Sequence, residues 1–177
     1  DCTSLVDVDI ADSVTSIGDY AFYGCSKLSE ISIPDKVTKI GDSAFEGCDK
    51  LTAIDIPDKV TKIGDSAFEG CDKLTAIDIP NEVTYIGNYA FNGCSSLTRI
   101  DIPSKVTYIG SYAFSNSGNL SAINVAEDNT SYHSIDGVLF DSSSIIYCPG
   151  KDREAYIIPE GIMNIAGSAF SDCVNLK

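Results

Sequence analysis

The sequence predicts a repeat solenoid of the α/β class, in which each repeat forms one coil from a short strand and a short helical turn. The main observation is that residues 35–57 are followed by an identical block, 58–80. Weaker copies extend on both sides, and three kinds of residue recur every 23 positions. They are Cys2, Cys25, Cys48, Cys71 and Cys94; Phe22, Phe45, Phe68, Phe91 and Phe114; and Pro34, Pro57, Pro80 and Pro103. A fixed period of this length is the signature of a solenoid.

The strand of each coil is predicted from alternation between apolar and polar side chains. In 31–33, two isoleucines flank the polar Ser32, which indicates a short strand with one buried face. Pro34 ends this strand because proline has no N–H to donate to a neighbouring strand. Val37 and Ile40 follow at a spacing of three, and we expect an extended segment that returns their side chains to the core.

The rest of the coil is predicted to bend and form one helical turn. Gly41 permits a tight bend. Asp42 is a suitable N-cap for a turn over 43–46, in which Phe45 fills the centre of the coil and after which Gly47 ends the turn. A single coil buries too little apolar surface to fold, so neighbouring coils must supply the stability.

The chain has seven cysteines, and two interpretations stay open for them. Coils stacked about 4.8 Å apart bring equivalent cysteines within disulfide range. Residues in such a ladder point in parallel, however, and Ser117 stands where the next cysteine of the ladder would fall. Buried free thiols are therefore the favoured interpretation. No cysteine pair or Cys/His spacing indicates a zinc site.

The regular repeats are predicted to cover residues 1–126 of a single domain, 1–177. Residues 127–157 form an irregular repeat, because the next proline, Pro159, comes 56 residues after Pro103 rather than 46. Two apolar runs around 141–144 predict a β-hairpin there. The regular pattern resumes over 158–177, with Ala166 in place of the usual glycine, which suggests an altered bend.

Composition excludes several classes of partner. Twelve basic residues stand against 26 acidic ones, and the formal net charge of −14 opposes binding to nucleic acid or to anionic lipid. No apolar run approaches the roughly 20 residues that span a bilayer, so no direct membrane insertion is expected. The chain begins and ends within a repeat, and we expect it to be part of a longer protein whose signal and anchor lie outside these residues.

The repeat pattern, LxxIxIPxxVxxIGxxAFxxC, resembles the BspA-like leucine-rich-repeat family of surface proteins (leucine-rich repeat type 5). The matching positions in one repeat are Leu51, Ile54, Ile56, Pro57, Val60, Ile63, Gly64, Ala67, Phe68 and Cys71. The resemblance covers nearly the whole chain. It implies a right-handed leucine-rich-repeat superhelix with a parallel β-sheet on one face and the helical turns opposite. It also implies a secreted or cell-surface protein that works in adhesion and binding.

Nothing in the sequence indicates catalysis. His133 is the only histidine, and we expect it in a solvated loop rather than in a nucleophilic device. Neither GxSxG nor GxGxxG is present, and the glycines recur with the structural period. We therefore expect no enzyme and no cofactor.

Two sets of outward positions form the candidate partner-binding surface. One row contains Asp55, Asp78 and Asp101, which should raise one another's pKa, with Arg99 nearby to neutralise part of the charge. A solvated acidic face and a face that takes a cation or a basic peptide are both open readings. A row with one carboxylate per coil is not a chelating loop, so no calcium site is expected. The second set contains tyrosines of the later coils, a residue enriched at recognition sites: Tyr85, Tyr108, Tyr89 and Tyr112.

The sequence as a whole predicts an extracellular binding or adhesion module that presents a repetitive acidic surface to a protein or glycan, on a host or a neighbouring cell. We expect a monomer. The alternatives are a spacer without catalytic activity and the substrate-recognition part of a larger secreted enzyme. The ladder of equivalent residues favours a binding surface, because catalytic residues are normally singular.

Overall fold

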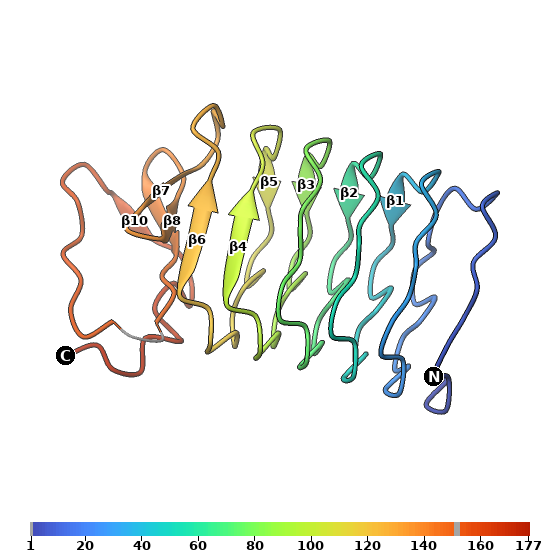
Figure 1. Cartoon of the computed structure of the whole chain (residues 1–177). Coiled ribbons are helices and arrows are strands. Elements are labelled where there is room, and N and C mark those ends of the chain that lie inside the picture. The colour runs from blue at the N-terminus through green and yellow to red at the C-terminus, as the bar shows by residue number, and fades with distance from the viewer. Residues whose placement is uncertain (1, 151–152) are drawn as a thin grey trace.

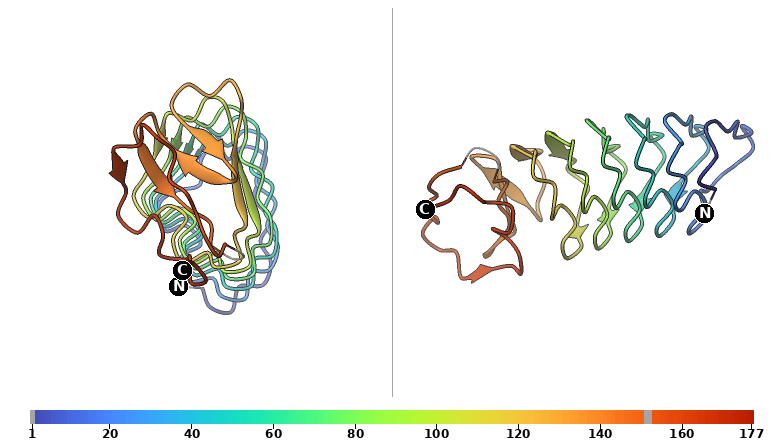
Figure 2. Two further views of the ribbon diagram at one scale, coloured as in Figure 1. Left: turned by 90° about the vertical axis from the view of Figure 1, so that its left-hand side faces the viewer. Right: turned by 90° about the horizontal axis from the view of Figure 1, so that it is seen from below.

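The computed structural model describes residues 2–150 and 153–177. The chain winds into a row of stacked coils, with the two termini at opposite ends of the row (Figure 1). Seen end-on, equivalent parts of successive coils superpose, and only the C-terminal part departs from the common outline (Figure 2). The predicted solenoid is confirmed.

Parallel strands connect the regular coils along two lines. The first is a four-stranded sheet in which each strand pairs with its equivalent in the next coil. Its members are β1 (Lys39–Ile40), β2 (Lys62–Ile63), β3 (Tyr85–Ile86) and β5 (Tyr108–Ile109). The second pairs β4 (Arg99–Ile102) with β6 (Ala122–Val125) and continues as the isolated bridge between Ser32 and Asp55. Only the second line follows the alternating segment predicted as a strand; the first lies where an extended segment was expected.

The helical turn expected at 43–46 is wrong, and so is the α/β class, because the described residues contain strands and turns but no helix. Ser43 has a positive φ of 52°, which lies outside the right-handed helical region. Every second backbone N–H group of this turn also points toward the next coil and not along the turn itself. Those of Ser43 and Phe45 donate to the carbonyls of Asp65 and Ala67 in the next coil, at 2.7 and 2.8 Å.

Asp42, predicted to cap that turn, instead links neighbouring coils. Its Oδ1 accepts a hydrogen bond from the backbone N–H of Asp65 at 3.1 Å, and its own N–H donates to Asp19 Oδ1 at 2.9 Å. Asp65 Oδ1 accepts in the same way from the N–H of Asn88, and Asn88 Oδ1 accepts from that of Ser111. The position therefore needs a short side chain with an oxygen acceptor.

The core is a stack of identical side chains. Phe22, Phe45, Phe68, Phe91 and Phe114 lie ring on ring, with neighbouring centroids 5.3–5.9 Å apart and planes within 10° of parallel. The rings of Phe45, Phe68 and Phe91 are fully buried. Such offset-parallel pairs contribute beyond the apolar area that they bury. The stack fixes each coil directly over the previous one.

The structure explains why serine can replace cysteine in the ladder. The thiols of Cys48, Cys71 and Cys94 each donate to a phenylalanine carbonyl of the preceding coil, as in the 3.3 Å contact from Cys71 Sγ to Phe45 O. Ser117 Oγ donates in the same way to Phe91 O at 3.0 Å. All seven cysteines lie among the described residues as free thiols, and all but Cys2 are buried, which confirms the favoured interpretation. Burial raises the pKa of the Cys94 thiol to about 12, so it stays protonated at neutral pH.

One of the two glycine ladders is required because the backbones of neighbouring coils approach closely there. Its members are Gly41, Gly64, Gly87 and Gly110. A Cβ on Gly64 would lie 2.5 Å from the backbone of Gly41 in the coil beneath, and this holds although Gly64 has no positive φ. The glycine is therefore needed for contact between coils, and not for the tight bend that the sequence suggested. Ala166 is tolerated at the equivalent place because it borders a pocket instead of a regular coil.

The irregular repeat forms a small antiparallel meander. It consists of β7 (His133–Ile135), β8 (Val138–Phe140) and β9 (Ser144–Tyr147), with β10 (Asn164–Ile165) parallel to β9. The predicted hairpin is confirmed as β8–β9. The turn between β7 and β8 at Asp136 and Gly137, both with positive φ, was not predicted, although Asp-Gly is the usual signal for it.

β8 divides the apolar core into two clusters. Leu139 packs into the core of the regular coils, whereas Val138 and Phe140 pack with Ala169 on the C-terminal side. Beyond Phe114 the ring stack ends on Tyr147, whose ring is tilted by 56° at a centroid distance of 6.1 Å. The meander therefore interrupts the regular stack while keeping both sides buried.

Replacing Phe68 by alanine tests the role of the ring stack. Because Phe68 is fully buried between two parallel rings, Phe68→Ala should lower the free energy of unfolding by about 3–5 kcal/mol. Urea denaturation followed by circular dichroism measures the change. The exposed Lys59→Ala is the control, with an effect of about 0.5 kcal/mol or less. An equal effect of both substitutions would contradict a stack that determines stability.

Candidate functional site

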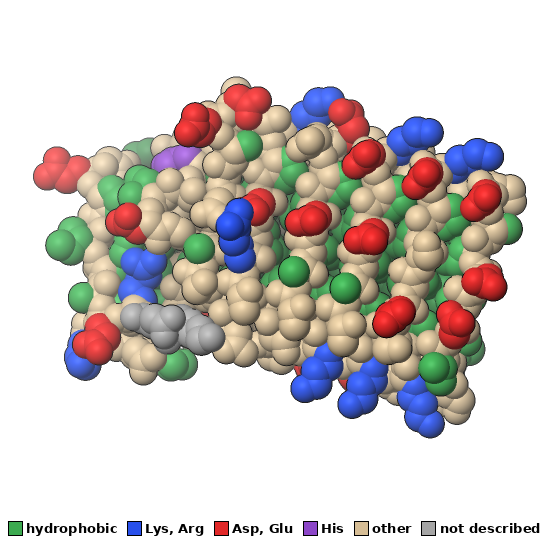
Figure 3. All heavy atoms as spheres, in the orientation of Figure 1, with side chains coloured by type: hydrophobic (Ala, Val, Ile, Leu, Met, Phe, Trp, Pro, Cys, Tyr) green, Lys and Arg blue, Asp and Glu red, His purple; other side chains and the backbone are tan. Residues whose placement is uncertain are grey.

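The acidic row lies on the face that carries β4 and β6. Asp55, Asp78 and Asp101 are exposed, and each stands between buried side chains of its strand segment. Figure 3 shows acidic side chains crossing this face above hydrophobic ones. Two open hollows of about 420 and 310 Å³ lie along the row, the first beside Asp55 and the second beside Asp78 and Asp101.

Asp101 differs from the other two aspartates because it is already paired. Arg99 Nε and Nη2 donate to its two carboxylate oxygens at 2.9 and 2.5 Å, and Asn124 Nδ2 donates at 2.7 Å. The hydrogen bonds from Arg99 hold the pKa of the Asp101 carboxyl below its usual value, although partial burial opposes this. The prediction that the neighbouring aspartates raise its pKa is therefore wrong.

The row offers no built metal site. In the part of the chain that the structure describes, no three His, Cys, Asp or Glu side chains gather closely enough to hold a metal ion. The described row is better characterised as a charged face, of which Asp55 and Asp78 are the accessible carboxylates.

The four tyrosines form two stacked pairs. The rings of Tyr85 and Tyr108 are 4.6 Å apart and those of Tyr89 and Tyr112 are 5.2 Å apart, each pair nearly parallel. Tyr108, Tyr89 and Tyr112 keep 40–43% of their surface exposed. We call these four residues the tyrosine patch.

The first pair is held by polar contacts from the preceding coils. Tyr85 donates to Asp65 Oδ1 at 3.3 Å, and Lys62 Nζ lies 4.9 Å from the centre of its ring. The pKa of the Tyr85 hydroxyl is raised, chiefly by desolvation and then by the charge of Asp65. Tyr85 is thus held in place by the preceding coil, and Tyr108 packs on its ring.

The structure separates the two candidate sets. Asp101 belongs to the β4–β6 sheet, whereas Tyr85 and Tyr108 belong to β3 and β5 of the four-stranded sheet. The end-on view places these sheets on different sides of the coil (Figure 2). The aspartates and the tyrosines therefore do not form one continuous contact surface.

His133 lies in a strand rather than in the predicted loop. It begins β7, is exposed, and its ring stacks on Phe140 at a centroid distance of 5.3 Å. This packing accounts for its position without a catalytic role.

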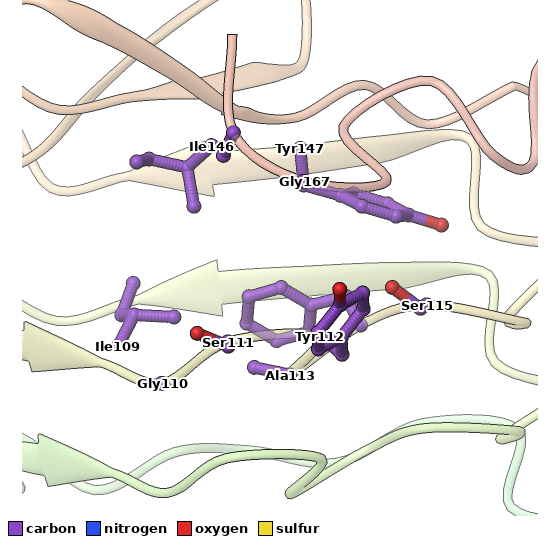
Figure 4. Close-up of a pocket in the computed structure, with 11 residues that line it drawn as sticks. Ile109, Gly110, Ser111, Tyr112, Ala113, Ser115, Ile146, Tyr147 and Gly167 are labelled. Carbon is purple, nitrogen blue, oxygen red and sulfur yellow. The ribbon is translucent and has the colours of Figure 1, made fainter.

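A pocket of about 220 Å³, which sequence reasoning missed, separates the last regular coil from the irregular repeat (Figure 4). The regular pattern calls for a phenylalanine 23 residues after Phe114, and Gly137 stands there in the turn of the meander. The missing phenylalanine was the available sequence signal that the core stack is interrupted here. The lining residues are Ile109, Gly110, Ser111, Tyr112, Ala113, Phe114, Ser115, Ile146, Tyr147, Ala166 and Gly167.

The family model for the BspA type leucine rich repeat region matches residues 1–121 in six copies. The chain belongs to the BspA-type leucine-rich repeat family. The resemblance inferred from the repeat pattern is thereby confirmed. A search of curated proteins found no match.

Solved structures of bacterial proteins share the BspA-type fold. A leucine rich cell surface protein from Faecalibacterium prausnitzii is 37% identical over 93% of this chain and 52% of its own, with a TM-score of 0.74. The pneumococcal vaccine antigen PcpA is 30% identical over 94% and 42%, with a TM-score of 0.83. A leucine-rich repeat protein from Eubacterium ventriosum is 27% identical over 86% and 47%, with a TM-score of 0.69. The chain thus spans about half the length of these relatives.

The search for membrane-spanning helices, limited to residues 2–150 and 153–177, found no helix with the length and hydrophobicity to cross a bilayer.

The pairing of Asp101 is testable by titration. In Arg99→Ala the carboxylate loses its two charge-assisted hydrogen bonds, so the pKa of Asp101 should rise. Carboxyl carbon chemical shifts followed by NMR between pH 2 and 7 measure it. Asn124→Ala should produce a smaller rise, since it removes one neutral donor. An unchanged pKa in Arg99→Ala would show that the pair does not form in solution.

Proposed function

We propose that this BspA-type repeat chain is an extracellular binding module without catalytic activity, and that it holds a protein or glycan partner through the tyrosine patch. The observation that carries the proposal is the replacement of residues along one sheet of a constant scaffold. Lys39 and Lys62 give way to Tyr85 and Tyr108 in strict register. The core beneath does not change, so the change alters only what the outer face presents.

The chemistry of the patch supports recognition. Tyrosine supplies a large amphipathic surface that loses little side-chain entropy on binding. Here the side-chain entropy lost on binding is smaller still, because the rings already stack on each other at 4.6 and 5.2 Å in the free protein. Aromatic residues are enriched at interfaces relative to the rest of the protein surface.

The acidic face would serve a different purpose in the same module. Its accessible carboxylates, Asp55 and Asp78, add to the net charge of −14 and favour the approach of a basic partner. Because the face lies on another side of the coil, it affects association rate more than the contacts of the patch.

The relatives support an extracellular setting. The Faecalibacterium protein is described as a cell surface protein, and PcpA as a vaccine antigen. This chain aligns with about half the length of these proteins, so it is comparable to one region of them.

The test uses residues that the repeats themselves supply. A triple variant, Tyr85→Lys, Tyr108→Lys and Tyr89→Ser, restores the side chains that earlier coils carry at these positions, so the fold should persist. The purified wild-type chain is first screened on a protein and glycan array. We expect the triple variant to lose at least about tenfold in affinity for the ligands found, since aromatic hot spots contribute most of the energy of such contacts.

Asp55→Ser is the matched control, because Ser32 holds the same place in the acidic row. It should change affinity less than the triple variant and act mainly on the association rate. Equal affinity of the triple variant and the wild type would overturn the patch as the binding site. No ligand on the array, together with unchanged attachment of cells displaying either protein, would favour a spacer.

A further inference from the structure

The pocket beside the last regular coil begins where a ladder of backbone donors ends. In the preceding coil, the N–H groups of Tyr89 and Phe91 donate to the carbonyls of Ser111 and Ala113, at 3.0 and 2.8 Å. The same pairing repeats in each earlier regular coil. The N–H groups at these positions therefore point toward the following coil.

The equivalent donors of the last regular coil have no following coil to receive them. Among the described residues, the N–H groups of Tyr112 and Phe114 form no hydrogen bond. Both residues line the pocket. Backbone N–H groups without a protein acceptor bond to water or to a ligand, so this pair at the pocket wall marks a place for an acceptor.

Ser115 provides a third donor. Only 5% of the surface of Ser115 is exposed, and its hydroxyl, which borders the pocket, forms no hydrogen bond among the described residues. Earlier coils carry Glu46, Glu69 and Asn92 at this position, and the smaller serine leaves the space open. Figure 4 shows Tyr112 and Ser115 on one side of the pocket, across from the two segments that carry Tyr147 and Gly167.

The other walls carry no ionised side chain and mix apolar side chains with the polar Ser111 and Tyr147. One face of the Tyr112 ring stacks on Tyr89, and the other faces the pocket beside Ile109 and Ile146. A Cβ on Gly167 would lie 3.4 Å from the Tyr112 hydroxyl, so this glycine closes the roof. No Asp, Glu, Lys, Arg or His belongs to the described lining, which excludes charge as the basis of recognition.

We propose that this pocket binds one neutral sugar residue at the end of a glycan. Ring hydroxyl oxygens accept from the N–H groups of Tyr112 and Phe114 and from Ser115, while the apolar face of the sugar ring lies against the aromatic walls. The volume of about 220 Å³ is below the range of about 300–1,000 Å³ typical of drug-sized ligands, and it suits a single ring. The inference rests on the proposed binding role and adds a site that shares only Tyr112 with the tyrosine patch.

A peptide is the less suitable occupant. Its carbonyls could accept from the two N–H groups, but a continuing chain needs a groove open at both ends. The segments that carry Tyr147 and Gly167 cover this pocket on one side instead. A short neutral peptide therefore becomes the competing probe of the test.

The experiment is a titration of the whole chain with methyl glycosides of glucose, galactose and mannose, with N-acetylglucosamine, and with acetyl-alanyl-alanine amide. Saturation-transfer NMR detects binding and calorimetry measures it. We expect at least one sugar to bind with a Kd on the order of 1 mM, as suits a small ligand held by a few neutral hydrogen bonds.

Ser115→Glu restores the residue found at this position in two earlier coils and fills the pocket. It should weaken the sugar by about tenfold or more, because a donor and the space are lost together. Asn92→Glu makes the same substitution one coil earlier and should leave binding unchanged. Tyr112→Ser is the second variant, since Ser43 and Ser66 adopt the same positive φ, and it should also weaken binding. Thermal melting verifies that each variant folds.

Three results would overturn the sugar site: no sugar bound by the folded wild-type chain, sugar affinity retained in both Ser115→Glu and Tyr112→Ser, or binding of the peptide alone. Failure here is separable from failure of the proposed function, because the triple tyrosine variant leaves Ser115 and Tyr112 intact. An array ligand that still requires Tyr85 and Tyr108 would preserve the binding role while the pocket is rejected.

Discussion

The register of each coil on the next is the constraint on which the rest of the structure depends. Backbone N–H groups, threonine hydroxyls and aspartate oxygens all bridge equivalent residues 23 apart, as in the 3.4 Å bond from Thr61 Oγ1 to Thr38 O and the 3.1 Å bond from Asp65 N to Asp42 Oδ1. A shift by one residue would break every ladder at once. The parallel phenylalanine rings depend on the same register, and so do the stacked tyrosines outside.

This constraint explains which parts of the fold could be predicted from the sequence. Buried positions such as Phe68 and Cys71 are visible as a period because they meet copies of themselves. The turn at Ser43 could not be inferred in the same way, since its residues are compatible with a helix. Only the carbonyls of the next coil, which accept from Ser43 and Phe45, draw the backbone out of helical geometry.

The candidate site also has features that the sequence predicts and features that it does not. Exposure of Asp55 and Tyr108 follows from alternation along the strands, whereas their separation onto different sides of the coil depends on how the chain turns between them. The lowered pKa of Asp101 depends on the side-chain geometry of Arg99. The pocket lies between residues 109–115 and the distant Ile146 and Gly167, so its walls cannot be read from a local pattern, and the sequence signals only that the phenylalanine ladder is broken at Gly137.

Hydrogen–deuterium exchange of individual backbone amides tests most directly the claim that the ladder between coils runs to the last regular coil and ends there. We expect strong protection for the amides of Phe45, Phe68 and Phe91, whose acceptors lie in the next coil, and much faster exchange for those of Tyr112 and Phe114. Equal protection of all five amides would contradict it, because it would require a further hydrogen-bonded coil where the structure has the pocket.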